Sequence, residues 1–203
     1  MKARFLEPEA ALAMERRLFD NPVLGGTREV WATRRCLVVP KVITRAPGFE
    51  AAREASARAG WPVYERITGG GIVPQGPGIV NVSLAYPADA PEVASLRGAY
   101  GTIGAPLIAC LGELGLDAGF GAQDGSWCDG DYNVLVEGRK LAGTAQRRGS
   151  KSVLVHLVMT VDADLEAGVD AVNRLAAAIG RTERVRASAH VNWRELAGEV
   201  EPP

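Results

Sequence analysis

The segment from residue 131 to residue 160 constrains the fold most, because it predicts three strands in succession. The stretch "DYNVLVEG" ends in the pair Glu137-Gly138, which is typical of a tight hairpin turn, and "RKLAGTAQRR" follows at once. A second turn at "GSK" leads into the apolar run "SVLVHLVMTV". In the first strand Tyr132, Val134 and Val136 share a face. We therefore expect an antiparallel meander here.

Two further strands are predicted before this meander. The stretch "REVWATRRCLVV", residues 28–39, is rich in β-forming residues and is expected to be one strand that ends at Pro40. A shorter strand, "PVYERI", leads into the glycine triplet at 69–71. Together with the meander, these strands predict a mixed, largely antiparallel sheet.

Apolar residues at helical spacing predict the flanking helices. Residues 8–20 begin with a proline and carry Leu12, Glu15, Arg16 and Phe19 in an amphipathic window that should cover the sheet. Residues 49–59 form a second helix that stops at Gly60, and a short helix follows Asn192. The fold class is therefore α/β in the broad sense, or α+β.

Two longer helices are predicted in the second half of the chain. Residues 91–116 are expected to form one long helix, weakened by glycines and Pro106, with this apolar stripe: Leu96, Tyr100, Ile103, Leu107, Cys110, Leu111 and Leu114. The stretch "DADLEAGVDAVNRLAAAIG" has an aspartate cap, a stop at Gly180 and its own stripe, made of Leu165, Val169, Val172, Leu175 and Ile179.

Length and charge limit the class of protein. The 203 residues, 47% of them hydrophobic, suit a single domain over residues 1–197 with a flexible tail at 198–203. Because 23 basic residues nearly balance 24 acidic ones, the net charge favours neither nucleic acid nor membrane as a partner. No apolar run is long enough to span a bilayer, and the first residues carry scattered charges, so we expect a cytoplasmic protein.

The three cysteines lie far apart, without the C-x-x-C spacing of a zinc or disulfide framework, and no metal site is expected. Cys36 and Cys110 fall in apolar patterns and are expected in the core. Cys128 differs, because Gly125, Ser126 and Asp129 surround it at a polar junction that substrate could reach. On residue type alone it could be a nucleophile or a bystander.

The remaining candidates have two interpretations each. Lys140 follows the hairpin turn and could serve a site or simply be a solvated lysine. His156 lies in an apolar strand, where a hydrogen-bonded core histidine is the simpler interpretation, and His190 is isolated near the end. Neither histidine pairs recognisably with Cys128, so a papain-like thiol protease is a poor fit. The triplet Gly69, Gly70 and Gly71 could be a flexible turn or a backbone cradle, but it lacks the pattern of a P-loop or dinucleotide site.

Taken together, "RITGGGIVPQGPGIVNVSL" and "DYNVLVEGRKLAGTAQRR" resemble the two signature blocks of the lipoate-protein ligase and octanoyltransferase superfamily, relatives of biotin protein ligase. The resemblance spans roughly residues 15–195. It implies that the glycine loop wraps a lipoyl or octanoyl chain and that Lys140 contacts its carbonyl. The implied substrate-binding set is Arg66, Thr68, Gly69, Gly70, Gly71, Asn81, Gly143, Thr144 and Gln146.

The stretch "GSWCDGDYNVLVEGRKLAGTAQRR" is most similar to the amidotransferase branch, in which a cysteine carries the acyl group. By this resemblance Cys128 is the nucleophile of an enzyme, and it forms a thioester before an octanoyl or lipoyl group passes to a lysine. The implied partners are the glycine cleavage H protein and the lipoyl domains of dehydrogenase complexes. The transferase branch implies no cofactor.

Two departures keep alternatives open. Glu65-Arg66 precedes the glycine loop and "PQGPG" follows it, where the ATP-using ligases have two arginines and a His-Asp-x-Gly-Asn run, although Asn81 could supply the loop asparagine. The chain also ends soon after its last helix, without the accessory domain of single-chain ligases. The alternatives are an ATP- and Mg²⁺-dependent lipoate ligase, with or without a separate accessory protein, and a non-catalytic acyl-binding protein.

Overall fold

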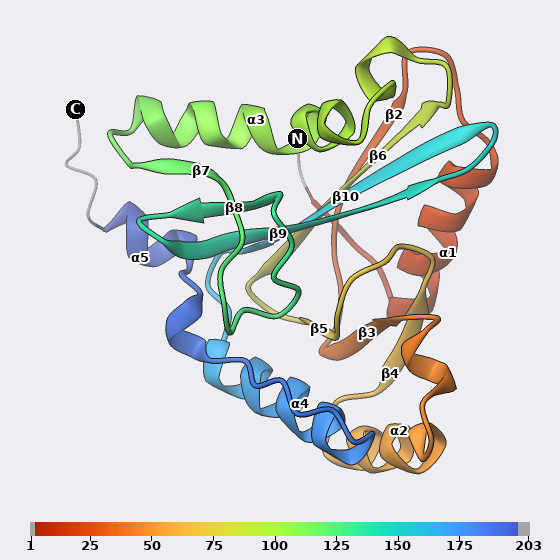
Figure 1. Ribbon diagram of the computed structural model, residues 1–203, viewed down its shortest axis with the longest axis vertical. Helices are drawn as coiled ribbons and strands as arrows, with labels where there is room; N and C mark the ends of the chain where they lie inside the picture. The colour runs from red at the N-terminus through yellow and green to blue at the C-terminus, as the bar shows by residue number, and fades with distance from the viewer. Residues whose placement is uncertain (1–2, 199–203) are drawn as a thin grey trace.

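The computed structural model describes residues 3–198, and they form two sheets with helices around them (Figure 1). The larger sheet has the order β1-β2-β6-β10-β9-β8-β7 and is antiparallel except for the β1–β2 pair. Its strands are β1 (Arg4–Phe5), β2 (Thr27–Ala32), β6 (Ile79–Pro87), β7 (Ala118–Gly121), β8 (Asn133–Val136), β9 (Arg139–Arg148) and β10 (Ser152–Thr160). This confirms the mixed, largely antiparallel sheet and the meander over β8, β9 and β10.

The smaller sheet has the order β4-β3-β5 and lies between the larger sheet and two helices (Figure 1). Its strands are β3 (Cys36–Pro40), β4 (Val63–Arg66) and β5 (Val73–Gln75). The helices α2 (Phe49–Arg58) and α4 (Leu165–Ala178) pack on it through one apolar cluster that includes Leu37, Val39 and Leu175. The cluster buries the outer face of the small sheet, and so holds this sheet against the rest of the molecule.

The expected single strand over residues 28–39 is wrong, because the chain changes sheets there. β2 ends at Ala32, pairing with β6, and β3 begins at Cys36, pairing with β4 and β5. The linking residues Thr33, Arg34 and Arg35 are polar, and Arg34 turns outward to bind Glu7 at 2.7 Å. This polar break lets one β-rich segment contribute to two sheets.

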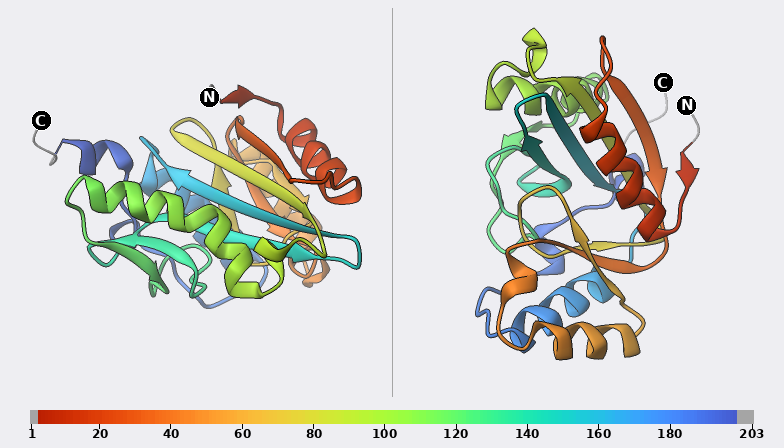
Figure 2. Two further views of the ribbon diagram at one scale, coloured as in Figure 1. Left: turned by 90° about the horizontal axis from the view of Figure 1, so that it is seen from above. Right: turned by 90° about the vertical axis from the view of Figure 1, so that its right-hand side faces the viewer.

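The remaining helices cover the two faces of the larger sheet. Alternate residues of β6 and β10, such as Leu84 and Val155, pack on α3 (Leu96–Glu113), whereas Ser83 and His156 face α1 (Pro8–Asp20). Figure 2 shows α1 and α3 on either side of the long strands. The short helix α5 (Trp193–Ala197) follows Asn192 as expected. Among the residues described, no helix combines the length and apolar character needed to cross a bilayer.

The helix predicted over residues 91–116 is shorter than expected, and part of its predicted apolar stripe is exposed to solvent. It begins at Leu96, capped by the Ser95 hydroxyl, which accepts a hydrogen bond from the Gly98 N–H at 2.8 Å; a separate 3₁₀ turn covers Pro91–Val93. Cys110, expected in the core, is exposed, and Leu96 is also exposed. The helix is apolar nearly all round, so its spacing did not identify the face that packs on the sheet.

Candidate functional site

The site is a cavity between the α1-facing side of the larger sheet and the smaller sheet. Its walls come from α1, β2, β3, β5, β9, β10 and the loops that hold the glycine triplet and Cys128. Four groups of residues line it: an apolar set with Val38, Val73 and Val158; the cations Arg66 and Lys140; Thr68, Thr144 and Cys128; and the polar pair Glu15 and His156. The cavity therefore has an apolar middle with polar groups at both ends.

Cys128 occupies a constrained position at one end of this cavity. It is half-buried and its φ is +64°, a left-handed conformation that side chains other than glycine rarely adopt. Its carbonyl accepts hydrogen bonds from Lys140 Nζ at 2.6 Å and Asn133 Nδ2 at 2.9 Å. Two buried side chains thus hold the strained residue in place.

Lys140 is buried, with 1% of its surface exposed, which excludes the interpretation of a solvated hairpin lysine. Its ammonium donates to the carbonyls of Trp127 at 2.5 Å and Cys128 at 2.6 Å, and its end packs over Gly143, where an added Cβ would lie 3.0 Å from Cε. Burial lowers the pKa of Lys140 to about 8, against an opposing effect of the nearby Cys128 and Asp129 charges. An ammonium has three N–H groups, so the third remains for a ligand.

The glycine triplet lies directly against the cysteine. At Gly70, φ is +106° and an added Cβ would be 2.6 Å from Cys128 Sγ, so only glycine fits there. The Arg66 guanidinium donates to the carbonyls of Gly69 and Gly71, each at 2.8 Å, and to Val38 at 2.7 Å. Burial lowers the pKa of Arg66 to about 10, and the Cys128 and Glu15 charges oppose this shift. Arg66 therefore fixes the conformation of the glycine loop by binding the backbone carbonyls of that loop.

The lining of the cavity also includes a buried acid and histidine that sequence reasoning did not pair. Glu15 contacts His156 Nδ1 and accepts a hydrogen bond from the Ser83 hydroxyl at 2.7 Å. Burial by itself raises the pKa of Glu15, but the charge and hydrogen bond of His156 outweigh it and hold that pKa below its ordinary value. His156 is a hydrogen-bonded buried histidine, as expected, and it also lines the cavity.

Two of the expected substrate-binding residues, Asn81 and Gln146, do not line the cavity. Asn81 is fully buried inside β6, where its amide and that of Gln75 exchange hydrogen bonds at 2.8 and 3.1 Å, so it does not belong to the glycine loop. Gln146 donates to the Leu96 carbonyl at 3.1 Å and does not line the cavity. Gln146 lies opposite Val155 on the α3-facing side of the sheet, whereas its neighbour Ala145 lies opposite His156 and lines the cavity.

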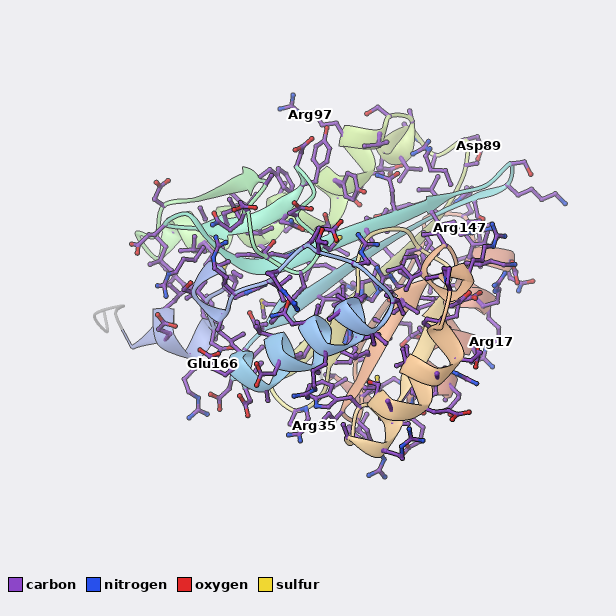
Figure 3. All side chains as sticks on the ribbon, turned by 60° about the horizontal axis from the view of Figure 1, so that its bottom comes forward. Arg17, Arg35, Asp89, Arg97, Arg147 and Glu166 are labelled. Carbon is purple, nitrogen blue, oxygen red and sulfur yellow. The ribbon has the colours of Figure 1, made fainter. Side chains whose placement is uncertain are left out.

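Arg147 lies outside the cavity and contacts the segment that leads into the glycine loop. It extends from the far part of β9 (Figure 3), donates to the Ile67 carbonyl at 3.0 Å and stacks over the Phe19 ring at 5.1 Å. Of the other expected residues, Thr68, Gly143 and Thr144 line the cavity, whereas Gly70 and Gly71 line an adjoining groove. Cys36 is buried, as expected.

His190 and Trp127 complete the support of the cysteine loop, and neither was predicted. His190 Nε2 accepts a hydrogen bond from the Trp127 N–H at 3.2 Å, and the two rings stack with centroids 3.6 Å apart. Burial lowers the pKa of His190 to about 4, and the Lys140 charge acts in the same direction, so the ring is neutral at pH 7. Its partner Trp127 lies 63 residues away in the chain, which no local sequence signal indicates.

Among residues 3–198, no three histidine, cysteine, aspartate or glutamate side chains gather as a group that could hold a metal ion.

Comparisons with known proteins show the family of this chain. Residues 7–198 match the family model of the lipoyl protein ligase A/B catalytic domain. An uncharacterized protein of Cupriavidus necator is 39% identical over 151 residues, which cover 66% of this chain and 60% of that protein. An octanoyl-GcvH:protein N-octanoyltransferase of Kyrpidia tusciae is 33% identical over 180 residues, which cover 81% of this chain and 61% of that enzyme. The chain thus spans about three fifths of these relatives.

Solved structures agree on the fold. A crystal structure of lipoate-protein ligase A bound with ATP superposes with a TM-score of 0.70 at 19% identity, covering 96% of this chain and 77% of that one. A putative lipoate protein ligase from T. acidophilum with bound lipoic acid gives a TM-score of 0.63 at 18% identity, with coverages of 98% and 94%.

Proposed function

Because this chain belongs to the lipoyl protein ligase A/B catalytic domain family, we propose that it is an acyltransferase that moves an octanoyl or lipoyl group onto a lysine of a lipoyl-carrier domain through a thioester on Cys128. The observation that carries the proposal is the position of Cys128. It lines the mainly apolar cavity on one side and an open groove on the other, with the Lys140 ammonium held against its own carbonyl.

The first half-reaction loads the cysteine. With the acyl chain in the cavity, the Cys128 thiolate attacks the carbonyl carbon of the donor amide, and the C–S bond forms. The C–N bond then breaks, and the leaving lysine amine takes up the proton that the Cys128 thiol lost when it became a thiolate. Lys140 offers its third N–H to the carbonyl oxygen as negative charge develops there, which stabilises the tetrahedral intermediate.

The second half-reaction reverses these roles. The amine of the acceptor lysine attacks the thioester, the C–N bond forms, the C–S bond breaks, and the sulfur takes up the proton that the new amide nitrogen loses. The proposed donor is an octanoyl-carrying glycine cleavage H protein, because a relative is named an octanoyl-GcvH:protein N-octanoyltransferase. A lipoyl-GcvH:protein N-lipoyltransferase of Listeria monocytogenes is 28% identical over 111 residues, which supports the lipoyl group as an alternative cargo.

The decisive test is the intact mass of the protein after mixing with octanoyl-loaded H protein. We expect a mass increase of one octanoyl group that hydroxylamine removes, and no increase in Cys128→Ala. The matched control is Cys110→Ala, which removes an exposed thiol far from the cavity and should keep the adduct. An adduct that persists in Cys128→Ala would exclude the thioester.

The proposed transfer consumes no ATP or Mg²⁺. Isotope exchange between ATP and pyrophosphate that depends on added lipoate would instead identify an ATP-dependent ligase. A non-catalytic acyl-binding protein would bind octanoate and keep its cellular role in both Cys128→Ala and Lys140→Ala.

A further inference from the structure

We propose that the groove on the solvent side of Cys128 is the channel through which the carrier lysine reaches the thioester. This inference rests on the proposed function, and it names the route of one substrate and two residues that receive it, Ser126 and Asp129. The occupant is the aliphatic stem and amine of a lysine on a folded carrier domain.

The position of the groove is the first argument. It has a volume of about 610 Å³ and runs between the glycine loop, residues 124–130, the end of α4 and residues 181–185. Cys128 and Trp127 line both this groove and the acyl cavity. With an acyl chain filling the cavity, the amine must approach the thioester carbon from the other side, which is the groove.

The chemistry of the walls is the second argument. Val172, Ala176 and Val185 give the groove an apolar side that suits the four methylenes of a lysine. Its charged residues are mostly paired with one another or with neighbours: Arg181 with Glu183 at 3.1 Å, and Asp124 with Arg186 at 3.6 Å.

Two charged side chains of the groove, Arg184 and Asp129, have no ion pair among residues 3–198. Arg184 donates to the Asn173 carbonyl at 3.3 Å, whereas Asp129, beside the cysteine, has no ion pair within the described part of the chain. Its carboxylate is exposed and available to an incoming ammonium.

Ser126 supplies the third argument. It is 5% exposed, and its hydroxyl has no hydrogen-bond partner among residues 3–198. A buried hydroxyl without a partner costs about 1–3 kcal/mol. Ser126 lines the groove two residues before the nucleophile, and a rotation about its χ1 that turns the hydroxyl out of its buried position would give it the substrate amine as a partner.

The resulting step balances as follows. The carrier ammonium pairs with Asp129 and releases one proton to water, and the free amine donates a hydrogen bond to Ser126 Oγ. Its lone pair attacks the thioester carbon, the C–N bond forms and the C–S bond breaks. The proton lost by the new amide nitrogen returns to the Cys128 sulfur.

Gly130 offers a way to close the channel without disturbing the fold. An added Cβ there meets no atom within 4 Å, and the backbone has no positive φ, so Gly130→Trp should fold and obstruct the groove. Gly119 is equally open but lies in β7, away from the groove, so Gly119→Trp is the matched control.

The experiment compares two nucleophiles on the same octanoyl-enzyme, loaded with p-nitrophenyl octanoate and confirmed by mass. We expect Gly130→Trp to slow transfer to the apo lipoyl domain at least tenfold, while release by hydroxylamine, which is small, stays within twofold of wild type. Gly119→Trp should change neither. Equal transfer rates for Gly130→Trp and wild type, or equal losses with both nucleophiles, would overturn the channel. Failure of the wild type to form any octanoyl-enzyme would instead overturn the proposed function.

A second variant tests the hydroxyl. Ser126→Ala should keep or raise the melting temperature, because it removes an unpaired buried group, and should slow transfer to the lipoyl domain about tenfold. Asp129→Asn should raise KM for the lipoyl domain several-fold at low salt, with little effect on hydroxylamine release. Unchanged transfer in both variants would remove these residues from the channel.

Discussion

The two ends of the acyl cavity are built on opposite physical principles. At the cysteine end, Cys128 lies on a loop at positive φ, and its carbonyl is tied down by side chains from β8 and β9. At the other end, Glu15 and His156 lie within α1 and β10 and satisfy each other. The backbone of Cys128 is strained next to the atom that we propose reacts, whereas Glu15 and His156 are hydrogen-bonded to each other within the core. Substitutions should therefore separate rate from stability.

The largest effect on stability is expected at the acid–histidine end. Glu15→Ala removes the buried carboxylate that pairs with His156 and accepts from Ser83, which keep only their neutral partners Asn81 and Trp31, so it should lower the free energy of unfolding by about 3–5 kcal/mol. Urea denaturation measures this change. Glu113→Ala, at the exposed end of α3, is the control and should stay within about 0.5 kcal/mol of wild type. Similar losses in both variants would remove the contrast.

The largest effect on rate is expected at the cysteine end. Lys140→Met removes the ammonium that we propose binds the acyl oxygen, so loading of Cys128 should slow about 10²–10³-fold. Its stability should fall by less than that of Glu15→Ala, because the change also removes the cost of burying a charge. Single-turnover mass spectrometry and urea denaturation give the two values. A variant that loads normally would exclude Lys140 from the reaction.

The pH dependence of the loading rate tests the role that we propose for the Lys140 ammonium. Its pKa is lowered to about 8, so the ammonium is present below pH 8 and is lost as the pH rises through that value. The rate of loading should therefore fall about tenfold per unit well above pH 8. An unfolded lysine keeps its proton to about pH 10.4, so this group adds stability as the pH rises between the two values. Lys140→Arg, which stays charged, should lose the descending limb.

The smallest expected effect is on the free energy of unfolding, and it tests whether the positive φ of Cys128 strains the backbone. Cys128→Gly relieves a side chain at positive φ and should raise the free energy of unfolding by about 1 kcal/mol while abolishing loading. The comparison variant Cys110→Gly places glycine inside α3 and should lower it by about 0.5–1 kcal/mol. Opposite signs would confirm that the cysteine end stores strain, and equal signs would contradict it.

The local features of the chain were predictable wherever neighbouring residues decide the structure. The tight turn predicted at Glu137-Gly138 is present, with Gly138 at a φ of +75°, and α4 begins at the Asp164 cap and ends before Gly180. The signature blocks also placed Cys128 and Lys140 at one site. These predictions depend on backbone preferences and short-range hydrogen bonds, which the sequence states directly.

Only the tertiary structure decided which distant groups meet and which surfaces are buried. Glu15 and His156 are 141 residues apart. Asn81 faces the same side of the sheet as the cavity but is covered by its hydrogen-bond partners Gln75 and His156, whereas Gln146 faces α3. Cys110 is exposed because a helix that is apolar on every side carries no signal for its packed face. Burial of Lys140 likewise requires the β-hairpin to close over the cysteine loop. Pairing and burial are properties of the packed chain, so no local pattern contains them.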